Sequence, residues 1–425
     1  MTSNKKCGKS GSERAEARVK QDGKQPVNRA TPNFKPKTIW TGDNLPIMRG
    51  MNSDCIDLIY LDPPFNSKRN YAAPIGSKAA GAEFKDTWTL DDIDEEWIDL
   101  IAEKKENKKL HRVLLSAMND SDKSYLVYMA VRLLEMKRIL KPTGSIYLHC
   151  DQTMSHYLKL VMDAIFGRDN FQNNFIWYYS GGGASKTRWA RKHDDILFYT
   201  KSKKWTFNAD VVRVPYKWTD GQKRADGSKR DYDKGKLADD VWEYHALMPW
   251  SKESTGFKTQ KPEALLERFI KASSNEFDLV FDPFCGCATT LATAEALGRK
   301  WIGIDISPEA TRLIRMRIEE QQGLWRDIIT RADNPQRTDL GKLPPPRSHF
   351  KKLYGEQLGK CNGCKRKPDD DFLDVDHIIA KAKGGSDHID NLQLLCRTCN
   401  RIKRDGSMEE LKKRLKKLEM FEEAA

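Results

Sequence analysis

The chain has 425 residues, of which 32% are charged, and a formal net charge of +13. This length suits two or three domains, and the surplus of Lys and Arg favours nucleic acid as a partner. No stretch approaches the roughly 18 apolar residues that cross a bilayer, and no signal-peptide core opens the chain. We therefore expect neither a membrane-spanning nor a secreted protein. For the same reason, the nine cysteines are expected to bind metal or stay reduced rather than form disulfides.

The first 36 residues are rich in Lys, Arg, Gly, Ser and Gln and contain almost no large apolar side chains. Such a segment cannot bury enough surface to fold. We predict a basic disordered tail over 1–36. It either adds nonspecific phosphate contacts or is simply solvated.

Short strands and helices then alternate along the chain. The pattern predicts strands at 38–40, 56–61, 145–148 and 196–199, and helices at 124–140 and 157–166. Such alternation favours an α/β domain with a largely parallel sheet.

The apolar strand at 56–61 ends in Asp62-Pro63-Pro64-Phe65. Because proline has no N–H, the chain must leave the sheet here. A carboxylate, free carbonyls and a flat ring at the end of a strand suit a planar base that carries an amino group. The alternative is a plain proline turn.

The regular pattern fails over 201–250, where Lys and Arg are mixed with aromatic residues. Basic side chains neutralise phosphates and aromatic rings stack on bases. This segment is therefore either a nucleic-acid contact region or an irregular insertion packed through its own aromatic residues.

A second chemical motif begins at the predicted strand 279–281. Small residues follow it, then a helix, so that the backbone can approach a cofactor at a helix N-terminus. About twenty residues later, the strand 301–304 ends in Asp305, which is placed to accept hydrogen bonds from ribose hydroxyls. Together these features predict a site for a nucleoside cofactor.

Over 38–318 the sequence resembles the β-class amino DNA methyltransferases. The resemblance rests on segments 42–45, 62–66, 144–151, 165–167, 193–197, 259–263 and 282–286. The Asp-Pro-Pro-Phe motif precedes the glycine turn, which is the permuted order of this class. The resemblance implies a Rossmann-like domain that moves a methyl group from S-adenosylmethionine to an exocyclic base nitrogen. It places part of target recognition at 201–250.

The resemblance also implies roles for single residues. The base is flipped out of the duplex, Asp62 and the Pro63 carbonyl accept its amino hydrogens, and Phe65 stacks on the ring. With Pro64 these form the expected catalytic set. In this family, an aspartate at the first position of the Asp-Pro-Pro-Phe motif usually accompanies methylation at adenine N6, and methylation at cytosine N4 is the alternative. The expected cofactor-binding residues are Asp43 (adenine), Phe284 and Gly286 (amino-acid end), Asp305 (ribose), Lys261, Pro262, Asp282 and Thr289.

One position departs from the family pattern, because Ala288 replaces the second glycine of the loop. Alanine fits there if the backbone avoids positive φ. We expect the replacement to be tolerated.

Beyond a proline-containing segment lie two Cys-x-x-Cys pairs, Cys361/Cys364 and Cys396/Cys399. Two such pairs in a reduced chain predict a closed, structural zinc site. Together with Asp376, His377 and Asn400, they resemble the HNH nuclease module, a ββα-metal fold, over about 358–405.

This second resemblance implies a metal-dependent endonuclease. His377 would activate water, Asp376 and Asn400 would hold one divalent cation such as Mg²⁺, and Asn391 would brace the loop carrying His377. The alternative is a zinc-stapled module that binds DNA without cutting it. Apolar residues at helical spacing over 407–422 predict a packing helix, or else a dimerisation helix.

The predicted organisation is a basic tail (1–36), a methyltransferase domain (37–330), a linker (331–357), an HNH domain (358–405) and a C-terminal helix (406–425). We expect a cytoplasmic bacterial, archaeal or phage enzyme that acts on double-stranded DNA, with modification and restriction in one chain. A homodimer stays open, as do an RNA target and a DNA-binding protein without catalysis.

Overall fold

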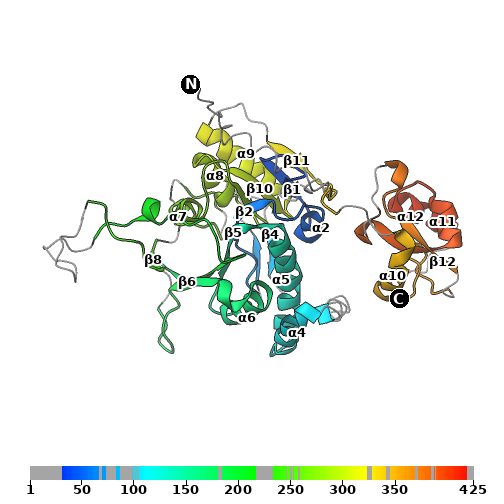
Figure 1. The fold of residues 1–425 in the computed structure, drawn as a ribbon, viewed down its shortest axis with the longest axis horizontal. Coiled ribbons are helices and arrows are strands. Elements are labelled where there is room, and N and C mark those ends of the chain that lie inside the picture. The colour runs from blue at the N-terminus through cyan, green and yellow to red at the C-terminus, as the bar shows by residue number, and fades with distance from the viewer. Residues whose placement is uncertain are drawn as a thin grey trace, which may run out of the picture.

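The computed structural model describes residues 31–66, 69–72, 83–86, 98, 101–102, 105–179, 184–216, 233–245, 247–248, 251, 253–256, 259–322, 328–340, 345–368, 372–383, 387 and 389–418. They form a large α/β domain and a smaller C-terminal module (Figure 1). Most of the predicted tail, residues 1–30, lies outside the described residues.

A nine-stranded sheet forms the centre of the large domain as described, in the order β11-β1-β10-β9-β2-β5-β7-β6-β8. Only β7 runs antiparallel to its neighbours. The strands are β1 (Thr38–Thr41), β2 (Ile56–Leu61), β5 (Leu140–Cys150), β6 (Phe171–Tyr178), β7 (His193–Thr200), β8 (Val241–Glu243), β9 (Leu279–Asp282), β10 (Lys300–Asp305) and β11 (Ile329–Arg331). The predicted α/β class with a largely parallel sheet is confirmed.

Helices cover both faces of this sheet (Figure 1). Side chains alternate along β2: Ile59 and Leu61 pack in one buried cluster, Leu58 and Tyr60 in the other. The helices are α2 (Asn44–Arg49), α4 (Lys108–Leu115), α5 (Asp120–Ile139), α6 (Ser155–Phe166), α7 (Glu263–Ser273), α8 (Thr289–Ala296) and α9 (Pro308–Gln322). Within the described residues, no helix is both long and apolar enough to cross a membrane.

Two strands that are far apart in sequence are neighbours at the centre of the sheet. Leu58 of β2 pairs with Val280 of β9, and the strands are parallel. Their carboxyl ends therefore meet at one edge, with β1 and β10 beside them. Ligands of open α/β sheets bind at this edge, and the chain places both of its predicted motifs there.

The aromatic residues predicted at 201–250 do not all face solvent. Trp242 on β8 is 8% exposed and packs on Phe269 of α7, with Arg268 over its ring. Packing through its own aromatic residues, one of the two predicted interpretations, thus describes Trp242. Trp218, Tyr232 and Trp250 lie outside the described residues. The strands β3 (Arg69–Ala72) and β4 (Glu83–Asp86) form a separate hairpin.

After β11 the chain returns to the large domain before entering the module. Asn52 donates to the Thr338 hydroxyl at 2.8 Å and accepts from the Thr338 N–H, and the Ser53 N–H donates to Asp339 at 2.8 Å. This part of the predicted linker is therefore anchored beside the amino end of β2.

The C-terminal module pairs β12 (Leu373–His377) with β13 (Leu392–Cys396) in an antiparallel hairpin, followed by α11 (Arg397–Lys403). The helices α10 (Phe350–Glu356) and α12 (Met408–Lys417) complete it, with Leu353, Leu411 and Leu415 in one buried cluster. The ββα arrangement is the predicted one. The last helix packs inside the module, as predicted, and a Ser407–Glu410 capping box starts it.

Candidate functional site

The carboxylate of Asp62 lies just past the end of β2 and is 17% exposed. Its Oδ2 is 3.0 Å from the Lys261 ammonium. Its Oδ1 is buried and has no hydrogen-bond partner among the described residues. A buried acceptor without a donor costs roughly 1–3 kcal/mol, so this oxygen is suited to a donor brought by a ligand.

Aromatic rings form the wall beside Asp62. Phe65 stacks on His149, with ring centroids 5.9 Å apart and an interplanar angle of 23°. The Lys261 ammonium is 5.3 Å from the Phe65 centroid and 5.9 Å from that of Trp177. Stacking on His149 therefore fixes the orientation of the half-buried Phe65 ring.

A chain of buried polar groups fixes His149 in turn. The Tyr60 hydroxyl lies 2.8 Å from Nδ1, and Asp194 Oδ2 lies 3.1 Å from Nε2. Tyr179 donates to the other oxygen of Asp194 at 3.3 Å. Burial alone raises the pKa of Asp194, but the hydrogen bond and charge of His149 and other neighbours hold it below its usual value. The ring orientation is therefore set on both nitrogens.

The turn after Phe65 is held by Asn66, whose φ is +58°. Asn66 is 3% exposed, donates to Asp122 at 3.0 Å and accepts from the Ser121 hydroxyl at 3.1 Å. Asparagine tolerates this left-handed conformation better than most residues. The tetrapeptide is thus fastened to the N-terminus of α5.

The predicted ribose acid, Asp305, ends β10 beside this site. It accepts the N–H of Gly286 and that of Ser307, each at 2.8 Å, and its carbonyl accepts the Gly42 N–H at 2.9 Å. Burial raises the pKa of Asp305 above its usual value, although these N–H donors oppose the shift. The glycine turn and the turn carrying Asp43 therefore converge on Asp305.

Asp43 is held by a residue from another helix. Its Oδ1 accepts from Arg132 at 2.7 Å and from the Leu45 N–H at 3.0 Å. The Arg132 guanidinium is buried and lies 3.4 Å from the Tyr128 centroid. The Asp43 side chain is 50% exposed, so it remains open to a ligand.

The loop between β9 and α8 has a strained position. Ala288 has φ +62° and ψ +30°, which is the left-handed region. The condition stated for its tolerance, a backbone that avoids positive φ, is therefore not met. For an L-residue this conformation costs roughly 1–2 kcal/mol. The reason is that the tight turn into α8 needs it, since the Ala288 N–H returns to the Cys285 carbonyl at 2.6 Å.

Arg317 of α9 ties this loop to α7. It donates to the Cys287 carbonyl at 3.1 Å and to the Thr289 hydroxyl at 3.0 Å, and it pairs with Glu263 at 2.5 Å. Thr289 thus turns its hydroxyl toward Arg317. Pro262 precedes α7 as its N-cap residue, beside Lys261.

The other two predicted loop residues differ in burial. Asp282 is 3% exposed and accepts the Phe284 N–H at 3.0 Å. Burial raises the pKa of Asp282 to about 7, against hydrogen bonds from Thr290 and Phe284 that lower it. Phe284 is half-buried, 6.4 Å from the Tyr128 ring. Asp282 thus shapes the loop from inside, and Phe284 lies nearer the surface.

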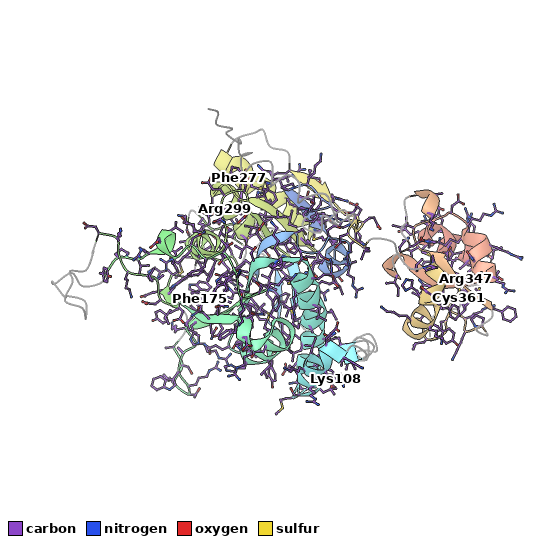
Figure 2. The ribbon with its side chains drawn as sticks, viewed as in Figure 1. Lys108, Phe175, Phe277, Arg299, Arg347 and Cys361 are labelled. Atoms are coloured by element: carbon purple, nitrogen blue, oxygen red, sulfur yellow. The ribbon has the colours of Figure 1, made fainter. Side chains whose placement is uncertain are left out.

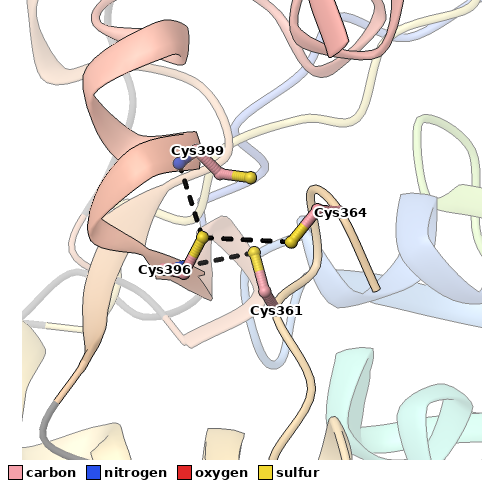
Figure 3. Close-up of side chains that lie close together, drawn as sticks. All are labelled: Cys361, Cys364, Cys396 and Cys399. Carbon is pink, nitrogen blue, oxygen red and sulfur yellow. Dashed lines mark hydrogen bonds between the residues drawn. The ribbon is translucent and has the colours of Figure 1, made fainter. Parts of the chain in front are cut away.

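In the C-terminal module the four predicted cysteines come together (Figure 3). Their sulfur atoms all lie within 4.8 Å of one another. A hydrogen bond from the Cys399 thiol, joined by backbone N–H donors such as that of Cys396, lowers the pKa of Cys361 to about 4. Thiolates at this spacing suit a tetrahedral metal ion.

The predicted nuclease residues lie on β12 and α11. His377 Nε2 is 2.8 Å from Asp387, and Asn391 exchanges hydrogen bonds with the backbone of Ile379, which braces this loop as predicted. Asp376 Oδ2 is 3.0 Å from the fully buried ammonium of Lys403. Asn400 lies on the same helix as Lys403, one turn earlier.

Comparison with known proteins decides the family. A model described as DNA methylase matches residues 56–316, more than half of the chain. The chain belongs to this DNA methylase family. Its methylase domain is followed by an HNH domain, because a model described as HNH endonuclease matches residues 361–406.

The alignments with individual relatives include most of each relative's length. The chain is 31% identical over 275 residues to the type II methyltransferase M.HpaI of Haemophilus parainfluenzae, covering 64% of this chain and 71% of that one. It is 28% identical over 311 residues to the DNA adenine methyltransferase YhdJ of Escherichia coli (strain K12), covering 72% and 90%. Among solved structures, a cytosine-N4-specific PvuII DNA methyltransferase matches with a TM-score of 0.42 and 18% identity, covering 68% and 90%.

Several residues that shape the two sites, four in the methylase domain and two in the HNH module, were absent from the sequence-based set. They are His149, Asp194, Arg132, Arg317, Asp387 and Lys403. Each acts through a partner that is far away in sequence or hidden among ordinary charged residues. Only His149 and Asp194 carried a signal, because both lie in segments on which the resemblance rested.

Proposed function

We propose that the methylase domain transfers a methyl group to the exocyclic amino group of a flipped DNA base, adenine N6 in preference to cytosine N4. The observation that carries the proposal is the buried Oδ1 of Asp62, which has no hydrogen-bond partner among the described residues, close to the ring of Phe65 through their shared neighbour Lys261. An amino group is a donor of the right kind for this oxygen. The adenine methyltransferase among the relatives supports the choice of base.

The residues of the chain divide the work of binding the base. Asp62 Oδ1 and the Pro63 carbonyl accept the two amino hydrogens, and Pro64 fixes the turn that presents them. Phe65 stacks on the base, with His149 holding the ring from behind. The Lys261 ammonium balances the charge of Asp62. The site thus orients one nitrogen, and positioning is a large part of such catalysis.

The residues at the ends of β1, β9 and β10 suit S-adenosylmethionine. Asp43 is half-exposed and held by Arg132, and Asp305 gathers the Gly286 and Asp43 turns at the same edge. We propose that Asp43 and Asp305 contact the nucleoside, and that Phe284 and Gly286 contact the amino-acid end. Lys261, Pro262, Asp282 and Thr289 complete or shape the site. When bound, the cofactor supplies an activated methyl group.

We further propose that the HNH domain cuts DNA. The observation that favours cutting over binding alone is the His377–Asp387 pair, which orients the imidazole of the residue that follows Asp376 on β12. An oriented imidazole can accept a proton from water near neutral pH. Asp376 and Asn400 offer few ligands, which fits Mg²⁺ because it keeps several waters and binds substrate phosphate.

The four cysteines are proposed to hold Zn²⁺ in a structural role. Their sulfurs are close enough to share one ion, and the cluster is largely buried between β13, α11 and the preceding loop. A closed site of this kind supplies folding energy rather than chemistry. The domain limits stated above are proposed as well, with two adjustments to the linker: its first part, around Thr338, is anchored to the large domain, and α10 belongs to the HNH module.

The test uses plasmid DNA and labelled S-adenosylmethionine, with and without Mg²⁺. We expect label in DNA in both conditions and nicked or linear plasmid only with the metal. Nucleoside analysis then separates N6-methyladenine, the expected product, from N4-methylcytosine. Absence of label in DNA would overturn the methyl-transfer proposal, and label on cytosine alone would overturn the choice of adenine.

A further inference from the structure

The connection between β6 and β7 carries an exposed tryptophan among basic residues. Trp189 is 96% exposed, although tryptophan buries more apolar surface than any other side chain can. Lys186, Arg188 and Arg191 beside it are also exposed. Segment 184–192 contains no Asp or Glu. The exposed indole leaves apolar surface in water, and together with the basic side chains it is complementary to a polyanion with flat, stackable bases.

The sheet topology places this loop at the base pocket. His193 of β7 pairs with Tyr178 of β6, and the Tyr179 N–H donates to the Lys192 carbonyl, so these residues close the base of the loop. Because β7 is antiparallel to β5, the loop leaves the sheet at the carboxyl edge, where Asp62 lies. Trp177 and Tyr179, 5.1 Å apart, connect the pocket wall to the loop.

We propose that loop 184–192 is a DNA-contacting element in which Trp189 enters the duplex beside the flipped base. The proposal rests on the proposed methyl transfer to a flipped base. Extrusion of a base leaves a gap in the stack, and an aromatic ring can stack on the neighbouring bases and hold the gap open. Lys186, Arg188 and Arg191 contact the flanking phosphates.

The part of the chain that the structure describes does not pair the charges of these basic side chains or cover Trp189. Within the described residues, Lys186, Arg188 and Arg191 form no ion pair with a carboxylate, and Trp189 packs against nothing that covers it. The base of the loop is nevertheless held in place, because the Tyr179 hydroxyl donates a hydrogen bond to Asp194. The loop therefore presents a fixed base and an uncovered tip.

The closing experiment compares Trp189→Ala, Trp189→Phe and a Lys186→Ala/Arg188→Ala/Arg191→Ala variant with the wild type. The target site is first mapped by sequencing methylated plasmid, and 2-aminopurine then replaces the target base in an oligonucleotide duplex. Fluorescence reports flipping, anisotropy at several salt concentrations reports affinity, and calorimetry reports binding of S-adenosylmethionine. Phe277→Ala is the matched control, since Phe277 is 70% exposed at the amino end of β9, the opposite edge (Figure 2).

For Trp189→Ala we expect kcat/KM for DNA to fall about 10- to 100-fold, with a weaker 2-aminopurine signal and unchanged cofactor binding. Trp189→Phe should recover much of the loss. In the triple variant the slope of log affinity against log salt should fall by about 0.9 for each lost phosphate contact. Phe277→Ala should match the wild type.

Wild-type activity separates the two proposals. If the wild type binds duplex DNA but transfers no methyl group, the proposed function fails, while the salt slopes still test the loop. If the wild type methylates DNA and the loop variants equal it in flipping, affinity and kcat/KM, the loop proposal is overturned. A change only in sedimentation mass on Trp189→Ala would also overturn it, by assigning the tryptophan to a contact between proteins.

Discussion

The two domains treat their key carboxylate in different ways. Asp62 and Asp376 each stand at the end of a strand, and each has a lysine ammonium 3.0 Å away. Among the described residues, one buried oxygen of Asp62 has no hydrogen-bond partner, whereas the paired oxygen of Asp376 also accepts from Gln393 at 2.9 Å. The first arrangement suits a neutral donor such as an amino group. In the second, one oxygen is already paired with both Lys403 and Gln393, so the cation proposed for this site would need water and phosphate among its ligands.

The domains also differ in what holds them together. The large domain has two extensive buried clusters, one on each face of its sheet. Among the described residues, the module has one small buried cluster, which includes Cys361, Cys364 and Cys399. Figure 2 labels Cys361 in the module and Phe175 on β6 of the large domain. Small cores are marginal without a metal or disulfide. Burial therefore stabilises one domain, and the cysteine cluster is positioned to stabilise the other.

The largest expected effect on the methylase side comes from Asp62→Ala. Loss of the acceptor should lower the methyl-transfer rate by at least about 100-fold, comparable to removing one aligned polar group from an active site. Binding of S-adenosylmethionine, measured by calorimetry, should stay within a few-fold of the wild type. An Asp62→Ala enzyme that methylates normally would remove the basis of the comparison.

On the nuclease side, His377→Ala should abolish Mg²⁺-dependent nicking without lowering methyl transfer. The variant removes the imidazole that Asp387 orients. Gel analysis of supercoiled plasmid measures nicking, and incorporation of label measures methylation in the same sample. Asp62→Ala serves as the reciprocal control, because it should nick normally. Unchanged nicking by His377→Ala would favour a module that only binds DNA.

Cys361→Ser tests whether the cysteine cluster holds the module together. We expect loss of about one zinc per chain by elemental analysis, since one tetrahedral ion needs all four thiolates. The module should unfold and nicking should be lost, while methylation persists. Cys55→Ser is the matched control: this buried thiol donates to the Asn52 carbonyl at 3.0 Å, a contact that a hydroxyl can replace. Retained zinc in Cys361→Ser would contradict the assignment.

Asp282 makes the stability of the large domain depend on pH. Because burial raises its pKa from 3.8 to about 7, the folded state binds the proton more tightly than the unfolded state. Its contribution to stability is thus complete below pH 4 and is lost as the pH rises to about 7. The Tm of the wild type minus that of Asp282→Asn should therefore be greater at pH 5 than at pH 8. An equal difference at both pH values would refute this.

The smallest effect is expected from Ala288→Gly. Glycine removes a left-handed strain of roughly 1–2 kcal/mol, and its freer unfolded chain returns about 0.4–1 kcal/mol. The free energy of unfolding in urea should therefore rise by between zero and about 1.6 kcal/mol. Ala288→Val, which adds β-branching at φ +62°, should instead destabilise the domain clearly. Stability lost on Ala288→Gly would show that the methyl contacts outweigh the strain.

Much of the fold could be predicted because its signals are local. The predicted helix at 124–140 is α5 at Asp120–Ile139, and the predicted strand at 196–199 lies within β7. Boundaries were less predictable. The strand predicted at 145–148 already begins at Leu140 in β5, because Leu140 pairs with Ile56 at the amino end of β2. When pairing with a neighbouring strand sets the end of a strand, the local sequence carries no signal for that end.

By itself, the sequence determined which chemical groups are present and at which strand ends they occur. Asp62-Pro63-Pro64-Phe65, the small-residue turn and the two Cys-x-x-Cys pairs each lie within a few residues, so a short stretch specifies each of them. Only the tertiary structure decided which groups meet. Lys261 reaches Asp62, Asp194 reaches His149 and Arg317 reaches Glu263 across the parallel pairing and helix packing of the sheet. Such contacts depend on folded geometry over many residues, and so does the position of loop 184–192 at the pocket edge.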